Sequence, residues 1–227
     1  MNESELITHD KCKAVFDTCE WYQIAGRLIL RLDKTDFKNI YLSKEVSEFF
    51  RESIENEYYI ESIYTALVNK YKSLCYDILD NSVDDLLRVA VLRKGYFRDI
   101  KDIDFLVYSS EKEARRYALD RCSIKALKVL TEDSEKIIRR DAYRRLGVQE
   151  HLDIMLEDKN LEVRYLAVCE APMFYYKLKE MKDEKSIKVF KEIAKKISIK
   201  EIPYLLGNRN SKNAFIKKVL SERLKSS

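Results

Sequence analysis

Three arginines recur in the middle of the chain at a near-constant spacing. Arg93, Arg121 and Arg145 each lie three residues after an alanine, and they are 28 and 24 residues apart. If each stands on a separate stacked helix, neighbouring guanidinium groups would lie about 10 Å apart, the usual distance between packed helices. Such a row could hold phosphates or a partner's carboxylates through paired hydrogen bonds. Its structural alternative is pairing with the carbonyls that end each helix or with the nearby carboxylates of Asp120, Asp141 and Glu170.

A second basic row and several tyrosines accompany these arginines. Arg88, Arg116 and Arg140 lie two residues before the same alanines, where we expect a solvated outer face. The tyrosines that could take part in binding are Tyr117, Tyr143, Tyr175 and Tyr176. Tyrosine beside arginine is typical of binding hot spots, and aromatic rings can stack on unpaired bases. Tyrosine also fills half-buried helix positions, and the AT-rich codon usage of a bacterial or phage-like genome would enrich it without selection for binding.

Residues that could carry catalysis or hold a metal are few. The chain has two histidines, His9 and His151. His9 and Cys12 would share a helix face with Cys19 two turns further, but three loosely spaced ligands make a poor zinc site. No phosphate-binding glycine loop, HExxH or GxSxG motif occurs. We therefore expect no enzyme activity, no cofactor and no metal.

Composition favours an all-helical protein. The 227 residues are 46% hydrophobic, enough for a sizeable core, and 36% charged, which suits helices with one wet face. Glycine (4) and proline (2) are too scarce for the turns of a sheet-rich fold. Residues 1–80 contain 10 basic and 15 acidic side chains, a net charge of −5, whereas residues 182–227 contain 13 and 5, a net of +8. This asymmetry could steer an anionic partner to one end, or it could reflect solvated helix faces.

The same survey bounds the compartment. No stretch approaches the roughly 20 apolar residues of a membrane span, and the acidic N-terminus does not resemble a signal peptide. Five cysteines are scattered without a CxxC pair, which argues against a disulfide framework. We expect a cytoplasmic protein that does not bind membranes.

A short unit recurs four times and must position the arginines. The copies read NSVDDLLRVAVLRKG, SSEKEARRYALDRCS, DSEKIIRRDAYRRLG and DKNLEVRYLAVCEAP, and their matching alanines are Ala90, Ala118, Ala142 and Ala167. Nine residues before each alanine stands a residue type that caps helices, namely Asn81, Ser109, Asp133 and Asp158. A shorter apolar segment precedes each cap. The near-fixed period therefore predicts stacked helical hairpins, each of which buries its apolar face only against its neighbours.

These copies resemble the HEAT-repeat family and its shorter leucine-rich-variant relatives. The resembling pattern is an aspartate six residues before an arginine that follows a branched apolar residue. It is carried by Asp133 with Ile138–Arg139 and by Asp158 with Val163–Arg164, and the copy with Ser109 and Ala114–Arg115 is close to it. The first copy departs, because Leu86–Leu87 lacks the arginine at the position that this spacing gives. The resemblance covers about residues 72–172 and implies a right-handed α-solenoid in which the acids and arginines form a structural ladder between repeats.

The flanks of the repeat are degenerate. A fifth unit would place Ala194 with the other alanines, and Lys185 and Lys191 in the acid and arginine positions. We expect residues 1–71 to be a helical segment that caps or extends the solenoid, and residues 72–227 to be repeats that end in a basic capping helix.

Function is predicted less sharply than fold. We expect a non-enzymatic scaffold for a protein partner. The alternative is a nucleic-acid-binding protein that uses the arginine row and the basic tail. HEAT-like alkylpurine DNA glycosylases use tryptophans with an Asp and an Arg in a basic groove, but the single tryptophan here, Trp21, lies outside the clear repeats. The partner and the oligomeric state stay open.

Overall fold

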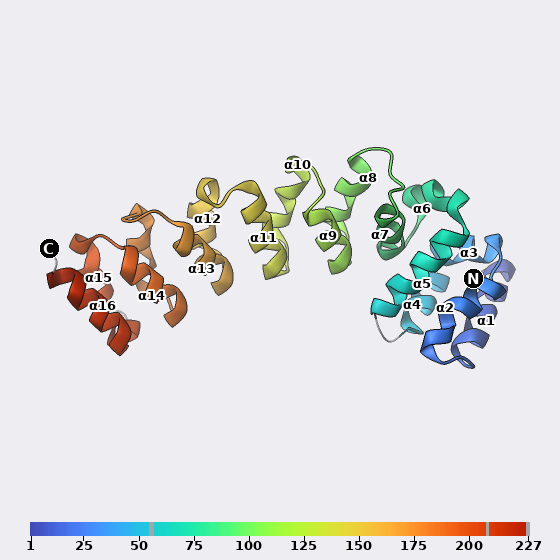
Figure 1. The fold of residues 1–227 in the computed structure, drawn as a ribbon, viewed down its shortest axis with the longest axis horizontal. Helices are drawn as coiled ribbons and strands as arrows, with labels where there is room; N and C mark the ends of the chain where they lie inside the picture. Colours follow the sequence, from blue (N-terminus) through green and yellow to red (C-terminus); the bar gives the residue numbers. More distant parts are fainter. Residues whose placement is uncertain (55–56, 208, 226–227) are drawn as a thin grey trace. The chain divides into compact units, whose positions relative to one another are not determined.

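The fold is all-helical, as predicted. The computed structural model describes residues 1–54, 57–207 and 209–225, and in these ranges every regular element is an α-helix or a 3-10 helix (Figure 1). No helix within the described ranges combines the length and the apolar character that crossing a membrane requires.

The chain divides into two compact units, Met1–Ala126 (unit 1) and Leu127–Ser227 (unit 2). This boundary separates two groups of residues that pack mainly among themselves. The boundary expected at residue 71 instead marks where the repeat pattern begins in the sequence. The short helix α10 (Ile124–Leu127) spans the boundary. The two units are described separately below.

Unit 1 contains the N-terminal helices and the first two recurring copies. Its elements are α1 (Glu3–Phe16), α2 (Trp21–Arg31), α3 (Lys34–Leu42), α4 (Lys44–Glu52), α5 (Glu57–Lys70), η1 (Lys72–Leu74), α6 (Cys75–Asn81), α7 (Asp85–Arg93), α8 (Lys101–Asp104), η2 (Phe105–Tyr108) and α9 (Lys112–Leu119). Its core is rich in aromatic side chains. Phe37, Tyr41, Phe50 and Tyr64 are fully buried, and the rings of Phe50 and Tyr64 stack with centroids 5.6 Å apart.

Unit 2 alternates long and short helical segments. Its elements are η3 (Val129–Glu132), α11 (Lys136–Leu146), η4 (Val148–His151), α12 (Leu152–Leu156), α13 (Leu161–Glu170), η5 (Tyr176–Asp183), α14 (Ile187–Lys196), η6 (Ile199–Glu201), α15 (Ile202–Leu206), η7 (Arg209–Lys212) and α16 (Ala214–Lys225). The long helices α11, α13, α14 and α16 contact one another in chain order (Figure 1). Their shared core includes Met155, Val163, Ala167, Phe190 and Ile193.

The recurring helices begin two residues later than predicted. Asp133 and Asp158 are not the caps, because α11 and α13 are capped two residues later, at Glu135 and Asn160. Each aspartate accepts the backbone N–H of that later residue, at N···O distances of 2.7 and 2.6 Å. Ser109 does the same for Glu111 at 3.0 Å. These side chains therefore form tight turns that deliver the chain to the caps. The observed caps are Glu111, Glu135 and Asn160.

The first copy is shifted by one residue from the predicted register. Asn81 ends α6, and Asp84 caps α7 by accepting the N–H groups of Leu86 and Leu87. Ser82 accepts the N–H of Asp84 at 3.0 Å, as Ser109 does for Glu111. Six residues after Ser82 comes Arg88, the spacing that separates Ser109 from Arg115. The first copy thus has the arginine that it was expected to lack.

The fifth unit is also shifted by one residue, but in the opposite direction. Glu184 accepts the N–H of Ser186 at 2.7 Å, and Ser186 caps α14. Glu184, not Lys185, therefore takes the acid position, and the fully buried Phe190, not Lys191, takes the arginine position. The prediction aligned Ala194 with the alanines of the other copies, whereas the structure aligns Ile193 with them. Both residues are fully buried, so burial of an alanine alone does not fix the register.

Candidate binding surfaces

Successive copies in unit 2 are joined by acid–arginine pairs. Arg139 of α11 donates from Nε and Nη2 to the two carboxylate oxygens of Asp158, both at 3.0 Å. Its Nη1 donates to the main-chain carbonyls of Asp133 (2.6 Å) and Ser134 (3.1 Å). Only 4% of Arg139 is exposed. The structure thus joins the side chains of two predicted ladder residues, Asp158 and Arg139. Asp133, the other predicted partner of Arg139, contributes only its main-chain carbonyl.

The next pair uses a glutamate. Arg164 of α13 donates to both carboxylate oxygens of Glu184, at 2.7 and 3.0 Å, and to the carbonyl of Asp158 at 2.8 Å. Burial opposes ionisation of Glu184, but the hydrogen bonds from Arg164 and from the N–H of Ser186 outweigh it and lower the pKa of that carboxyl. Paired charges of this kind fix the spacing of helices and are not available to a ligand.

Unit 1 contains related contacts. Arg115 donates to the carbonyls of Ser109 (3.0 Å) and Ser110 (2.9 Å), and the Ser109 hydroxyl donates to Asp85. Arg88 donates to Asp85 at 2.6 Å, and its guanidinium lies 5.0 Å from the centre of the Phe105 ring. Arg88 is therefore half-buried between α7 and η2, which corrects the expectation of a solvated outer face.

In unit 1, two arginines of the row contact the buried ring of Tyr117. Arg93 of α7 pairs with Glu61, and its guanidinium lies 5.7 Å from the centre of the Tyr117 ring. Arg121 lies 4.3 Å from the same ring and donates to the Tyr117 carbonyl at 3.2 Å. Tyr117 itself is only 8% exposed, and burial raises the pKa of its hydroxyl. These contacts favour the structural alternative for Arg93 and Arg121.

Basic side chains late in the long helices have a role that sequence reasoning missed. Lys196, in the last turn of α14, donates to the carbonyls of Cys169 and Ala171 at the end of α13 (the latter at 2.6 Å). Arg223 of α16 does the same for Ala194 (2.8 Å) and Ile197 (2.5 Å) at the end of α14. Lys70 of α5 donates to Ile29 and Leu32 at the end of α2. Lys196 and Arg223 thus cap the preceding long helix, and Lys70 caps α2, which α3 and α4 separate from α5 in the chain.

Lys196 lies ten residues after the cap of its helix, and Arg121 and Arg145 lie ten residues after theirs. Arg145 is exposed in the last turn of α11. A base at this shared position could have indicated the capping role from the sequence, because cations are favourable near the C-terminal ends of helices.

Most of the remaining residues that were predicted to bind a partner contact other residues of the protein instead. Tyr175 and Tyr176 donate to the two oxygens of Asp153, at 2.8 and 2.6 Å. Burial and the Asp153 carboxylate raise the pKa of Tyr175 to about 12. Tyr143 is buried with its ring centre 5.7 Å from that of His151. Arg140 is half-buried and pairs with Asp141, whereas Arg116 is exposed.

An exposed aromatic patch in unit 1 was not predicted. The loop that joins α7 to α8 (Figure 1) is fixed by Arg98, which donates two hydrogen bonds to Asp80 and three, one of them from its backbone, to Asp102. Tyr76, 5.8 Å from the Arg98 guanidinium, is half exposed (50%), as are Phe97 (49%) and Ile100 (45%). We call Tyr76, Phe97, Arg98 and Ile100 the Arg98 patch. The sequence feature that could have indicated this loop is the first repeat period, which is 28 residues long, whereas the next two are 24 and 25. The extra residues lie in the loop.

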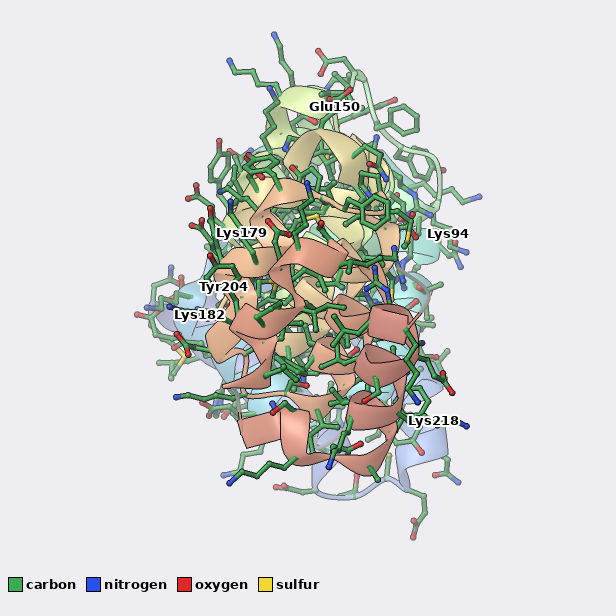
Figure 2. All side chains as sticks on the ribbon, turned by 90° about the vertical axis from the view of Figure 1, so that its left-hand side faces the viewer. Lys94, Glu150, Lys179, Lys182, Tyr204 and Lys218 are labelled. Atoms are coloured by element: carbon green, nitrogen blue, oxygen red, sulfur yellow. The ribbon has the colours of Figure 1, made fainter. Side chains whose placement is uncertain are left out.

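A basic and aromatic surface lies on the long helices of unit 2. Lys188 of α14 pairs with Glu162 at 3.0 Å, and its ammonium lies 4.0 Å from the centre of the Tyr165 ring on α13. Lys191 stands 5.1 Å from the centre of the Phe215 ring on α16. We call these four residues the Lys188 face. A separate hollow between η5 and α15 is lined in part by Lys179, Lys182 and Tyr204, which Figure 2 shows on the side of the unit opposite Lys218.

His9 and Cys12, two residues that were weighed as metal ligands, have packing contacts. No group of three or more His, Cys, Asp or Glu side chains in the described ranges could hold a metal ion. The His9 ring packs on Phe49 with centroids 3.9 Å apart, and Cys12 is fully buried. Burial raises the pKa of the Cys12 thiol to about 12, so it behaves as a small core residue.

Comparison with known proteins places the chain in no family, because no family model, curated protein or solved structure matches it.

Proposed function

We propose that the protein is a non-enzymatic scaffold, a right-handed α-solenoid of short helical hairpins, that binds a protein partner through the Arg98 patch. The contacts in chain order between α11, α13, α14 and α16 support the solenoid, because each long helix packs on its neighbours and not around one centre. The five cysteines, none of them in a disulfide, support a reducing cytoplasm as its location.

The single observation that carries the proposal is the ordering of an exposed loop. Five hydrogen bonds from Arg98 hold the segment from Lys94 to Ile100, although its large side chains face water. The segment has a length that is common for connections between helices. Fixing apolar side chains before binding lowers the entropy that binding must overcome. Tyrosine, arginine and phenylalanine are also residue types enriched at protein interfaces.

Charge favours a protein over a nucleic acid at this patch. The bases on and beside it are Lys94, Arg98 and Lys101, and the acids are Asp80, Asp99 and Asp102. Three charges of each sign leave no net attraction for a polyanion. The hydrogen bonds to Asp80 and Asp102 also occupy the Arg98 guanidinium. A partner segment with apolar side chains fits this surface best.

Affinity capture from the native host followed by mass spectrometry tests the proposal. The bait is compared with a Phe97→Ala/Ile100→Ala variant and with Tyr204→Ala, a control that removes an exposed ring (65%) in unit 2. We expect a captured protein to be lost with the double variant and kept with the control. Its dissociation constant should rise about 30-fold, as for the loss of a hot spot of about 2 kcal/mol. Equal affinity of the double variant would contradict the proposal.

A nucleic-acid-binding function is the second candidate, and the Lys188 face favours it. Unit 2 contains 23 basic and 16 acidic residues, a net charge of +7, and lysines over aromatic rings suit stacked bases and phosphates. Binding to single-stranded oligonucleotides should then weaken by about 0.7 log unit per log unit of salt for each phosphate contact. Lys188→Gln/Lys191→Gln should reduce that slope, and an unchanged slope would remove the candidate.

A further inference from the structure

The outward face of α1 combines apolar and acidic side chains. Glu3, Leu6, Ile7 and Asp10 follow helical spacing and share one side of the helix, and all four are exposed. Leu6 and Ile7 are 46% and 50% exposed, whereas Thr8, Cys12 and Val15 on the other side are buried. The helix packs on α2, α3 and α4 through that buried side. The outward side is therefore a small apolar patch between carboxylates, which we call the head face.

The outward face of α16 has the opposite charge. Lys217, Lys218, Leu224 and Lys225 are exposed, whereas Ile216 and Leu220 are buried on the side that meets α14 and η7. Leu224 is 42% exposed, and the Lys218 side chain is 74% exposed and projects outward in Figure 2. We call this side of α16 the tail face. It presents Leu224 among three lysines and one glutamate, Glu222, which pairs with Lys218 at 3.9 Å, whereas the head face presents leucine and isoleucine among acids.

The charges around the two faces are complementary over a wider range. Residues 1–80 have a net charge of −5, and residues 182–227 have a net of +8. Opposite fields accelerate encounter and select orientation, while apolar contact at the centre supplies affinity.

We propose that the head face of one copy binds the tail face of a second copy. The contact is heterologous, so each bound copy keeps one free head or one free tail, and assembly continues until a ring closes or the concentration limits growth. The Arg98 patch takes no part in this contact, so self-association and the proposed function can fail independently.

Sedimentation velocity of the full chain over a range of concentrations tests this inference. At about 50 mM salt we expect the weight-average mass to exceed that of the 27.0 kDa chain and to rise with concentration. At about 500 mM salt the association should weaken at least tenfold, because surface charges are then screened within a few ångströms. A single 27.0 kDa species at every concentration and at low salt would overturn the inference.

Two charge-reversed variants make the test specific. The head variant is Glu3→Lys/Asp10→Lys, and the tail variant is Lys217→Glu/Lys218→Glu. All four positions are exposed, so thermal melting followed by circular dichroism should show both variants folded. Each variant alone should stay monomeric, because its own two faces then repel each other. Mixing the two should restore association, since every head then finds a tail of opposite charge. Association of either variant alone as strong as that of the native chain would refute the assigned faces.

Discussion

At the scale of single residues, paired charges between successive helices are the most constrained feature of the molecule. Arg139 makes four hydrogen bonds while almost wholly buried, and Arg164 makes three. Each arginine joins the turn before its own helix to the acid that precedes the next long helix. An arginine is required because its planar donors reach a carboxylate and a carbonyl at the same time.

Removing one partner of the buried pair should be costly. We expect Arg139→Ala to lower the free energy of unfolding by about 3–5 kcal/mol, because it leaves the Asp158 carboxylate buried without its partner. Urea denaturation measures the change. Arg139→Met combined with Asp158→Leu should recover much of the loss, and the exposed control Arg116→Ala should stay within about 0.5 kcal/mol of the native protein. A loss from Arg139→Ala no larger than that of the control would show that the pair is not structural.

The second pair predicts a pH dependence. The pKa of Glu184 in the folded protein is lowered from its usual 4.5, so its contribution to stability is complete above about pH 4.5 and is lost as the pH falls through the folded value. Glu184→Gln should therefore be less stable than the native protein at pH 7, and the difference should shrink toward pH 3. Urea midpoints at both pH values measure it. A difference that stays constant from pH 7 to 3 would contradict a role for the ionised carboxylate.

At the scale of elements, long helices are closed by bases supplied from the next long helix. Lys196 holds the end of α13 and, through its own carbonyl, accepts the N–H of Phe174 at 2.8 Å. Phe174 has a φ of 64°, a left-handed conformation that is costly for a residue with a side chain. The turn after α13 is thus held in place by α14.

Loss of this cap should act locally. We expect Lys196→Met to lower stability by about 2 kcal/mol, since two carbonyls lose a charged donor, and to speed amide exchange at residues 169–174. Lys195→Met is the matched control, because Lys195 is exposed and pairs only with Glu192 in the same helix. Hydrogen exchange read by mass spectrometry distinguishes the two variants. Equal exchange in both would argue that the cap does not order this turn.

At the scale of the whole molecule, the two units have separate cores. The aromatic cluster around Phe50 lies within unit 1, and the cluster around Phe190 lies within unit 2. Because each unit packs around its own core, damage should spread within a unit first.

Cavities in each core test that separation. Phe190→Ala should destabilise the protein by about 3–5 kcal/mol and should raise amide exchange throughout Leu127–Ser227 before it does so in Met1–Ala126. Phe50→Ala, which empties a fully buried site in unit 1, should give the reverse order. The same order for both variants would mean that the chain unfolds as one cooperative body.

The sequence by itself determined the helical class and several of the elements. Glycine and proline are too scarce for the turns of a sheet, and apolar residues recur at helical spacing. Helices satisfy the backbone hydrogen bonds of such a chain within each segment. The six-residue spacing also nominated Arg139 and Asp158, which the structure joins, but not Glu184, the acid that pairs with Arg164.

Tertiary structure alone decided the register of the outer copies and the partners of the bases. Ala90 and Val91 are both buried, so only the bond from Asp84 to the start of α7 shows which residue matches the other alanines. The residues around Lys196 and Arg223 do not indicate which carbonyls these side chains reach, because those carbonyls lie at least 25 residues earlier in the chain. Periodicity reports which side of a helix is apolar, but the contacts of a long charged side chain depend on what the next helix brings beside it.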